Sequence, residues 1–289
     1  SMFGFQRIGD LAWAAGDMQA RGFLIGATAG RTTLAGEGLQ HQDGHGLIVA
    51  STIPNCVAYD PCFAYELAVV IHDGMRRMVQ EQENVYYYIT SMNENYTMPA
   101  MPKGAEQGII KGMYQFSKDK AKKGETKAQL FGSGTILREV IEAAELLKKD
   151  WKISADVWSI TSYNELAREA VDCERWNMLN PTKKARVPYI TKQLEKAEGP
   201  VIASSDYIRT VSNQVRQYVP ATYTVLGTDG FGRSDTRKNL RRHFEVNSHY
   251  VVLATLKTLA DEGTIPASKV NEAIKKYGID TKKPNPLTA

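Results

Sequence analysis

The fold is decided by the stretch AQLFGSGTILREVIEAAELLKKDWKISADVWSI, residues 128–160. Residues 128–134 form a short apolar run that ends in Gly and Ser, which is typical of a buried strand leading into a turn. In residues 135–150 apolar side chains recur at helical spacing along one face. A second apolar run follows at residues 155–160. A strand, a helix and a strand in this order predict a parallel sheet covered by helices.

The same alternation continues on both sides of this stretch. Further short runs of β-branched and aromatic residues predict strands at residues 23–28, 55–60, 85–90, 200–205 and 224–230. Helical patterns predict helices at residues 7–21, 62–82, 163–176, 206–219, 247–263 and 266–278. We therefore expect an α/β fold built on mostly parallel sheets with helices on both faces.

A non-periodic segment divides the chain. Residues 91–108 contain two prolines and no repeating pattern, so we place a domain boundary there and divide the chain into residues 1–101 and 102–289. The first part shows only about three strands, which is fewer than a doubly wound sheet usually has. This predicts a fragment whose sheet is completed by a part outside the chain.

Composition excludes several classes of function. The chain has 36 Lys and Arg against 32 Asp and Glu, and its basic residues are scattered, whereas nucleic-acid binding needs a concentrated basic face. No apolar run approaches the length of a membrane span, and the first residues do not resemble a signal peptide. The three cysteines form no CxxC pair, which argues against a zinc or redox motif. The odd and sparse set of cysteines fits a reducing compartment, so we expect a cytoplasmic protein, and one that binds neither nucleic acid nor membranes.

The segment GRTTLAGEGLQHQDGHG, residues 30–46, is the first candidate site. It leaves the carboxyl end of the expected strand at residues 23–28, which is where ligands bind in open α/β sheets. Its His41 and His45 could exchange protons near neutral pH or hydrogen-bond a carboxylate. A solvated surface loop is an alternative. A zinc pair is a third, but Gly44 between the histidines disfavours the helix that such a pair needs.

A second glycine-rich segment, TDGFGRSDTR at residues 228–237, follows the expected strand at residues 224–230. A phosphate-binding loop occupies such a place, but both GxGxxG and the Walker lysine are absent. We therefore expect a shaped loop at a domain or dimer interface. His72 lies within a helical pattern, where we expect a structural role.

Long blocks of the sequence resemble one family. SMFGFQRIGD, GRTTLAGEGLQHQDGHG, TIPNCVAYDP, ENVYYYITSMNENYTMPAMPKGAEQGI, DCERWNMLNP, RVPYI and VLGTDGFGRSDTR are similar to the homodimeric decarboxylating component of the pyruvate dehydrogenase complex. The resemblance spans essentially the whole chain and corresponds to about the last third of that family's proteins. Transketolase, with a similar GE-G-x-x-H loop, is a more distant relative.

The resemblance implies a thiamin diphosphate and Mg²⁺ enzyme. In that family the cofactor lies between the diphosphate-binding domain of one subunit and the pyrimidine-binding domain of the other. Residues 1–101 resemble the later part of the pyrimidine-binding domain, and residues 102–289 resemble the C-terminal domain. The family's GDG signature, its metal ligands and its cofactor-activating glutamate do not map onto this chain. We therefore expect no metal ligand here. We also expect the chain alone to bind the cofactor weakly or not at all, and to be inactive.

Two family roles map onto single residues. Phe3 matches the aromatic residue that stacks on the aminopyrimidine ring, and His41 matches the active-site histidine that faces the substrate. The resemblance thus predicts that both line one crevice. It assigns no role to Arg7 or His45.

The implied function is decarboxylation of pyruvate and transfer of the acetyl unit to the lipoyl group of the complex's acetyltransferase, by a homodimer. A transketolase-type ketol transferase is an alternative, although it needs a basic grip for sugar phosphates where residues 36–46 offer carboxylates. A non-catalytic fragment for dimerisation or complex assembly is another.

Overall fold

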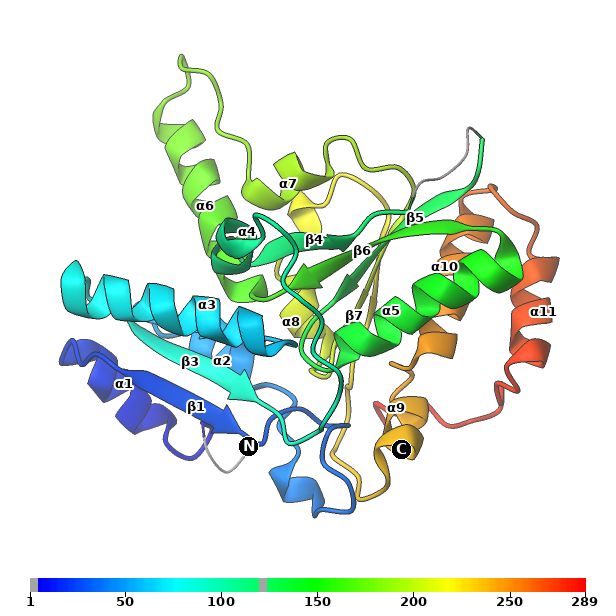
Figure 1. Cartoon of the computed structure of the whole chain (residues 1–289), viewed down its shortest axis with the longest axis horizontal. Helices are drawn as coiled ribbons and strands as arrows, with labels where there is room; N and C mark the ends of the chain where they lie inside the picture. The colour runs from blue at the N-terminus through cyan, green and yellow to red at the C-terminus, as the bar shows by residue number, and fades with distance from the viewer. Residues whose placement is uncertain (1–4, 120–123) are drawn as a thin grey trace.

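The structure is a computed structural model that describes residues 5–119 and 124–289. Two sheets lie side by side, each covered by helices (Figure 1). The first sheet has the strand order β1-β3-β2, with all strands parallel. Its strands are β1 (Phe23–Ala27), β2 (Cys56–Tyr59) and β3 (Tyr86–Ser91). All three strands lie where the sequence predicts them.

The tyrosine run of β3 divides its side chains between two cores. Tyr86 and Tyr88 pack with α1 (Gly9–Asp17) and α2 (Gly46–Ser51), whereas Tyr87 packs with α3 (Ala64–Met75) and α4 (Glu106–Lys111) on the other face. Successive side chains of a strand point to opposite faces, so this run suits a strand buried on both sides.

The second sheet has the order β4-β6-β5-β7-β8. Its strands are β4 (Met113–Ser117), β5 (Lys127–Gly132), β6 (Ser154–Ile160), β7 (Val201–Ser204) and β8 (Tyr223–Leu226). Four strands are parallel and were predicted, whereas β4 pairs antiparallel with β6 at the edge and was missed. Only one neighbour covers an edge strand, so β4 mixes buried and exposed residues and lacks a continuous apolar run.

Helices cover both faces of the second sheet (Figure 1). One face packs against α5 (Ile136–Leu146) and α10 (Ser248–Asp261), and the other against α6 (Tyr163–Leu179), α7 (Tyr189–Leu194) and α8 (Arg209–Asn213). The helix α11 (Ser268–Lys276) packs against α10. The short helix α9 (Arg237–His243) follows β8. The α/β class with mostly parallel sheets is therefore confirmed.

Two predicted helices are shorter than their patterns. The helix expected at residues 7–21 ends at Asp17, because the chain turns into a left-handed conformation at Gln19, where φ is 56°. The helix expected at residues 206–219 is broken into α8 and a short 3-10 helix, η4 (Arg216–Tyr218). Its sequence is rich in Thr, Val, Ser and Asn, which have low helix propensity.

The two sheets share a core. Leu47 and Tyr86 from the first part join Phe131, Trp158 and Tyr207 from the second in one buried cluster. Residues 92–104 connect the parts without a helix or strand. The division after residue 101 lies in this connection and stays a prediction.

The carboxyl ends of both sheets meet at this shared core. Asp60 follows β2, and its backbone amide donates to the carbonyl of Thr161, which follows β6, at 2.8 Å. The amide of Gly134, which follows β5, donates to the carbonyl of Asp60 at 3.1 Å. Because ligand sites of α/β sheets lie at these strand ends, the junction between the two sheets is a candidate ligand site.

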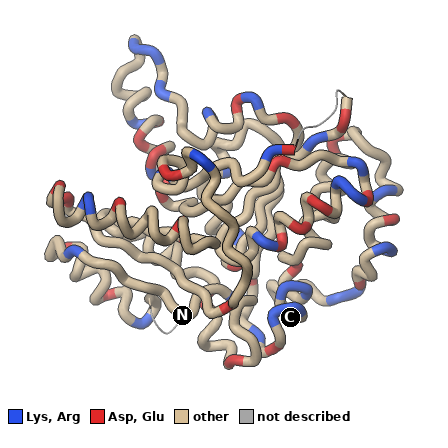
Figure 2. Tube along the Cα trace, in the orientation of Figure 1, with Lys and Arg blue, Asp and Glu red and all other residues tan. Residues whose placement is uncertain are grey.

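Charged residues of both signs are interspersed along the described chain, with a short basic run at α9 (Figure 2). No helix of the described residues is long and apolar enough to cross a membrane.

Candidate active-site loop and its contacts with the second part of the chain

The glycine-rich loop at residues 30–46 is held by the second part of the chain. The carboxylate of Asp206, which lies after β7, accepts the amide of Thr32 at 2.9 Å and the hydroxyl of Thr33 at 2.8 Å. Gly30 has a φ of 85°, and a Cβ there would lie 2.1 Å from the Asp206 carboxylate. The close approach therefore explains why glycine stands at this position.

Arg31 crosses from the loop to the segment after β8. Its side chain is buried, and its Nη1 donates to the carbonyl of Thr228 at 2.6 Å and to the carbonyl of Gly230. Burial lowers the pKa of Arg31, and the nearby carboxylates Asp43 and Asp206 oppose that shift. The loop is thus fixed by a buried cation among carbonyls and carboxylates.

The carboxylate of Asp43 has a structural role. Its Oδ1 accepts the amides of His45 at 3.0 Å and of Gly46 at 2.8 Å, where α2 begins. The hydroxyl of Tyr88 donates to its Oδ2 at 3.4 Å. This carboxylate is therefore committed to the start of α2.

The two loop histidines occupy different surroundings. His41 is half-buried at the end of the 3-10 helix η1 (Leu39–His41). The Nε2 of His45 lies 3.0 Å from the side-chain oxygen of Gln6. Among the described residues, no group of three or more His, Cys, Asp and Glu side chains could hold a metal ion, so the structure gives the zinc reading no support.

The other proposed pocket residue, Phe3, lies outside the described residues. The shared crevice of Phe3 and His41 therefore stays a prediction. The nearby Phe5 is buried and packs edge-on against Tyr88, with ring centroids 4.5 Å apart. His72 is exposed on α3, contrary to the structural role expected from burial.

Sequence reasoning missed a buried polar cluster beneath the loop. Asp60 is fully buried, and its Oδ1 accepts the hydroxyl of Thr90 at 2.6 Å. Desolvation raises the pKa of Asp60 to about 7, and the hydrogen bond from the hydroxyl of Thr90 opposes this rise, whereas the nearby Asp206 adds to it. Oδ2 of Asp60 and Oγ of Ser133 have no hydrogen-bond partner among the described residues. The available signal was a polar residue directly after a buried strand.

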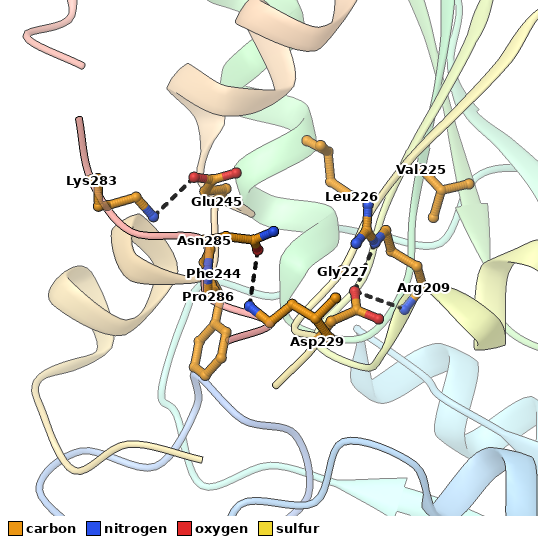
Figure 3. Close-up of a pocket in the computed structure, with 11 residues that line it drawn as sticks. Arg209, Val225, Leu226, Gly227, Asp229, Phe244, Glu245, Lys283, Asn285 and Pro286 are labelled. Atoms are coloured by element: carbon orange, nitrogen blue, oxygen red, sulfur yellow. Dashed lines mark hydrogen bonds and ion pairs between the residues drawn. The ribbon is translucent and has the colours of Figure 1, made fainter. Parts of the chain in front are cut away.

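A cavity of about 330 Å³ opens at the carboxyl end of β8, between this strand and the C-terminal residues (Figure 3). Its charged groups are paired with one another, because Arg209 Nε lies 2.8 Å from Asp229 Oδ2 and Lys283 Nζ lies 3.0 Å from Glu245 Oε1. His41 is not among its lining residues. This cavity therefore does not join the loop's chemistry.

The described residues do not fit the metal-diphosphate part of the implied cofactor. The carboxylates Asp43 and Asp206 next to the loop already accept hydrogen bonds from backbone amides, and the described part of the chain contains no metal-ligating cluster.

Comparisons with known proteins first define a class. A family described as "Pyruvate dehydrogenase E1 component middle domain" matches residues 1–99, and one described as "Transketolase-like TK C-terminal domain" matches residues 112–247. The structure resembles transketolase from Campylobacter jejuni with a TM-score of 0.62 and 16% identity, over 89% of this chain and 34% of that one. It resembles a split-gene transketolase, described as an inactive beta4 tetramer, with a TM-score of 0.53 and 14% identity, over 88% of this chain and 81% of that one. The fold is transketolase-like.

Sequence relatives narrow the class. The chain is 61% identical over 288 residues to the pyruvate dehydrogenase E1 component of Cupriavidus necator, 63% over 288 residues to that of Pseudomonas aeruginosa and 62% over 291 residues to that of Escherichia coli K12. These matches cover 99–100% of this chain and 32% of each relative, so the chain spans about a third of their length. The chain is a homologue of part of the pyruvate dehydrogenase E1 component, with one region that matches its middle domain and one that matches a transketolase-like C-terminal domain.

Proposed function

We propose that this chain supplies the middle-domain and C-terminal part of an enzyme that decarboxylates pyruvate with thiamin diphosphate and Mg²⁺ and passes the acetyl unit to a lipoyl group on the acetyltransferase of the complex. The observation that carries the proposal is identity above 60% to E1 components along essentially the whole chain. The ring system of the cofactor supplies the difficult chemistry, so the protein needs only to bind and orient the cofactor and the substrate and to exclude water from them.

Within this part, His41 is the residue that meets the substrate. Its imidazole can donate a hydrogen bond to the carboxylate of pyruvate, which suits a group that is partly exposed beside a fixed loop. The hydrogen bonds of Asp206 and Arg31 that fix this loop support the role, because a catalytic side chain must be held in place by its surroundings.

The enzyme acts as a homodimer, and residues 1–289 alone are inactive. Apolar side chains of the first part are exposed, including Leu11 at 68%, Trp13 at 45% and Ile25 at 51%, and β1 is an edge strand of its sheet. Exposed apolar surface of this kind is typical of an interface with another chain or domain. The site of action is the cytoplasm, in keeping with the three free, buried cysteines Cys56, Cys62 and Cys173.

A chimeric enzyme tests the proposal. Residues 1–289 replace the matching third of the Escherichia coli E1 component, and pyruvate-dependent reduction of ferricyanide is measured with thiamin diphosphate and Mg²⁺. We expect turnover by the chimera and none by residues 1–289 alone. A folded chimera without turnover would overturn the proposal.

Two control reactions separate the alternatives. A ketose phosphate with an aldose phosphate acceptor replaces pyruvate, and we expect no ketol transfer, whereas transfer would identify a transketolase-type enzyme. Adding the lipoyl domain of the acetyltransferase tests the second half of the reaction, with reductive acetylation as the expected result.

A further inference from the structure

The second glycine-rich segment, residues 228–237, lies directly against the loop that carries His41. It follows β8 in the C-terminal part, whereas the loop at residues 30–46 follows β1 in the first part. Arg31 donates to the carbonyls of Thr228 and Gly230, so the segment turns acceptors toward the loop. A phosphate site would require donors there, and the carbonyls therefore favour a structural partner for the loop.

Gln42, the residue after His41, makes a second contact with this segment. Gln42 is 1% exposed, its Nε2 donates to the carbonyl of Arg233 at 2.6 Å, and the amide of Arg233 donates to its Oε1 at 2.6 Å. This reciprocal pair satisfies both ends of the amide group. It fixes the exit of η1 against the segment.

Gly232 holds the entry of the same 3-10 helix. A Cβ at Gly232 would lie 2.6 Å from the carbonyl oxygen of Leu39 and 2.9 Å from Oε1 of Gln42. The backbone of the segment thus touches η1 at its first residue and just beyond its last. His41 is the last residue of η1 and lies between these two contacts.

Two more hydrogen bonds hold the earlier part of the loop. The amide of Gly36 donates to the carbonyl of Asp235 at 2.9 Å, and Nε of Arg237 donates to the carbonyl of Thr33 at 2.6 Å. The segment therefore follows the loop along most of its length.

Support from outside is physically necessary for η1. Its backbone hydrogen bonds are those from His41 to Gly38 at 3.0 Å and from Gln42 to Leu39 at 3.2 Å. A helix of three residues cannot hold itself, because nucleation costs more free energy than one or two hydrogen bonds return. Gly38 and Gly44 on either side add backbone freedom.

We infer that residues 228–237 form a template that sets the position of His41, with Gln42 and Gly232 as its positioning residues. The inference rests on the proposed function, in which His41 meets the substrate. It assigns the C-terminal part of the chain a direct influence on turnover, although none of these template residues needs to touch pyruvate.

The chimeric enzyme carries the test, with Gly232→Ala and Gln42→Leu as variants and Gly22→Ala as the matched control. Nothing lies within 4 Å of a Cβ at Gly22. We expect kcat to fall roughly tenfold or more in both variants, because small misplacements of a catalytic group are costly. Cofactor affinity and the midpoint of thermal unfolding should stay as in the parent, since a general loss of structure would lower both.

Hydrogen exchange of the backbone amides at residues 38–42, measured by mass spectrometry, is the second readout. Faster exchange in both variants, with no change in the control, is expected. Unchanged exchange would show that the template does not hold the loop, and faster exchange with an unaltered kcat would show that His41 needs no template. If the parent chimera is inactive, the proposed function fails, and the exchange result alone decides whether the template exists.

Discussion

The buried carboxyl group of Asp60 is hydrogen-bonded on one side only, by the hydroxyl of Thr90 at 2.6 Å. Its other oxygen has no hydrogen-bond partner among the described residues, and the nearby ionisable groups Asp206 and Glu66 are both acids. A carboxyl group in such surroundings keeps its proton to higher pH than it would in water. The junction between the two sheets is therefore sensitive to pH.

Asp60→Asn should make stability less dependent on pH. The folded protein keeps the Asp60 proton to about pH 7, whereas the unfolded chain loses it near 3.8, so the contribution of Asp60 to stability falls as pH rises through that window. Between about pH 5.5 and about pH 8.5 this effect should lower the free energy of unfolding of the parent by roughly 2 kcal/mol, and the variant should not show this loss. Urea unfolding at both pH values measures this, with the exposed Asp17→Asn as control. If the free energies of unfolding of variant and parent differ by the same amount at the two pH values, the raised pKa of Asp60 is refuted.

Glu66→Ala should be strongly destabilising. The buried carboxylate of Glu66 accepts the amides of Cys62 at 2.6 Å and Phe63 at 3.0 Å, and the hydroxyls of Tyr114 and Ser159 at 2.6 Å each. Removing it leaves four buried donors without their acceptor, which should cost about 3 kcal/mol or more. Thermal unfolding tests this against Glu145→Ala, an exposed position on α5. A loss no greater than that of the control would contradict the prediction.

Arg168→Met should weaken the link between α6 and the first part of the chain. Arg168 donates from Nη1 to the carbonyl of Cys56 at 2.6 Å and from Nη2 to the carbonyl of Ile53 at 2.8 Å. We expect a loss of about 1–3 kcal/mol in unfolding free energy, because these carbonyls lose a charged donor. Arg175→Met, at an exposed position on the same helix, is the control, and equal stability of the two variants would speak against the link.

His41→Ala in the chimeric enzyme should lower kcat/KM for pyruvate by roughly a hundredfold, because on the proposed function the variant lacks the imidazole that contacts the substrate. His72→Ala, on the exposed side of α3, should leave it unchanged. Steady-state kinetics at several pH values are the measurement. Parent-like kinetics for the His41 variant would remove His41 from the proposed site.

Most of the elements could be predicted, because buried parallel strands consist of continuous apolar runs and amphipathic helices carry a regular apolar face. The antiparallel edge strand β4 escaped because one side of it is open, so its five residues lack such a run. The helix expected at residues 206–219 begins only at Arg209, after Asp206, whose carboxylate binds the loop at residues 30–46, a contact that no local pattern encodes.

The candidate site was only half accessible to sequence reasoning. The glycine-rich loop at a strand end indicated His41 as a candidate site residue. The family resemblance predicted a role for Phe3 and the identity of the cofactor. The contacts that hold this loop could not be predicted, because Asp206 and Arg233 lie 164 and 191 residues beyond Gln42 in the chain. Side chains so far apart show no periodicity or spacing that links them.

The sequence by itself determined the α/β class, the buried strands, the main helices and the family, because each depends on local patterns or on ordered blocks of residues. Only the tertiary structure decided that the carboxyl ends of two sheets meet, that Asp60 is buried there, and that residues 228–237 hold the loop bearing His41. These features depend on which distant surfaces exclude water together, and that is settled when the two parts of the chain pack against each other.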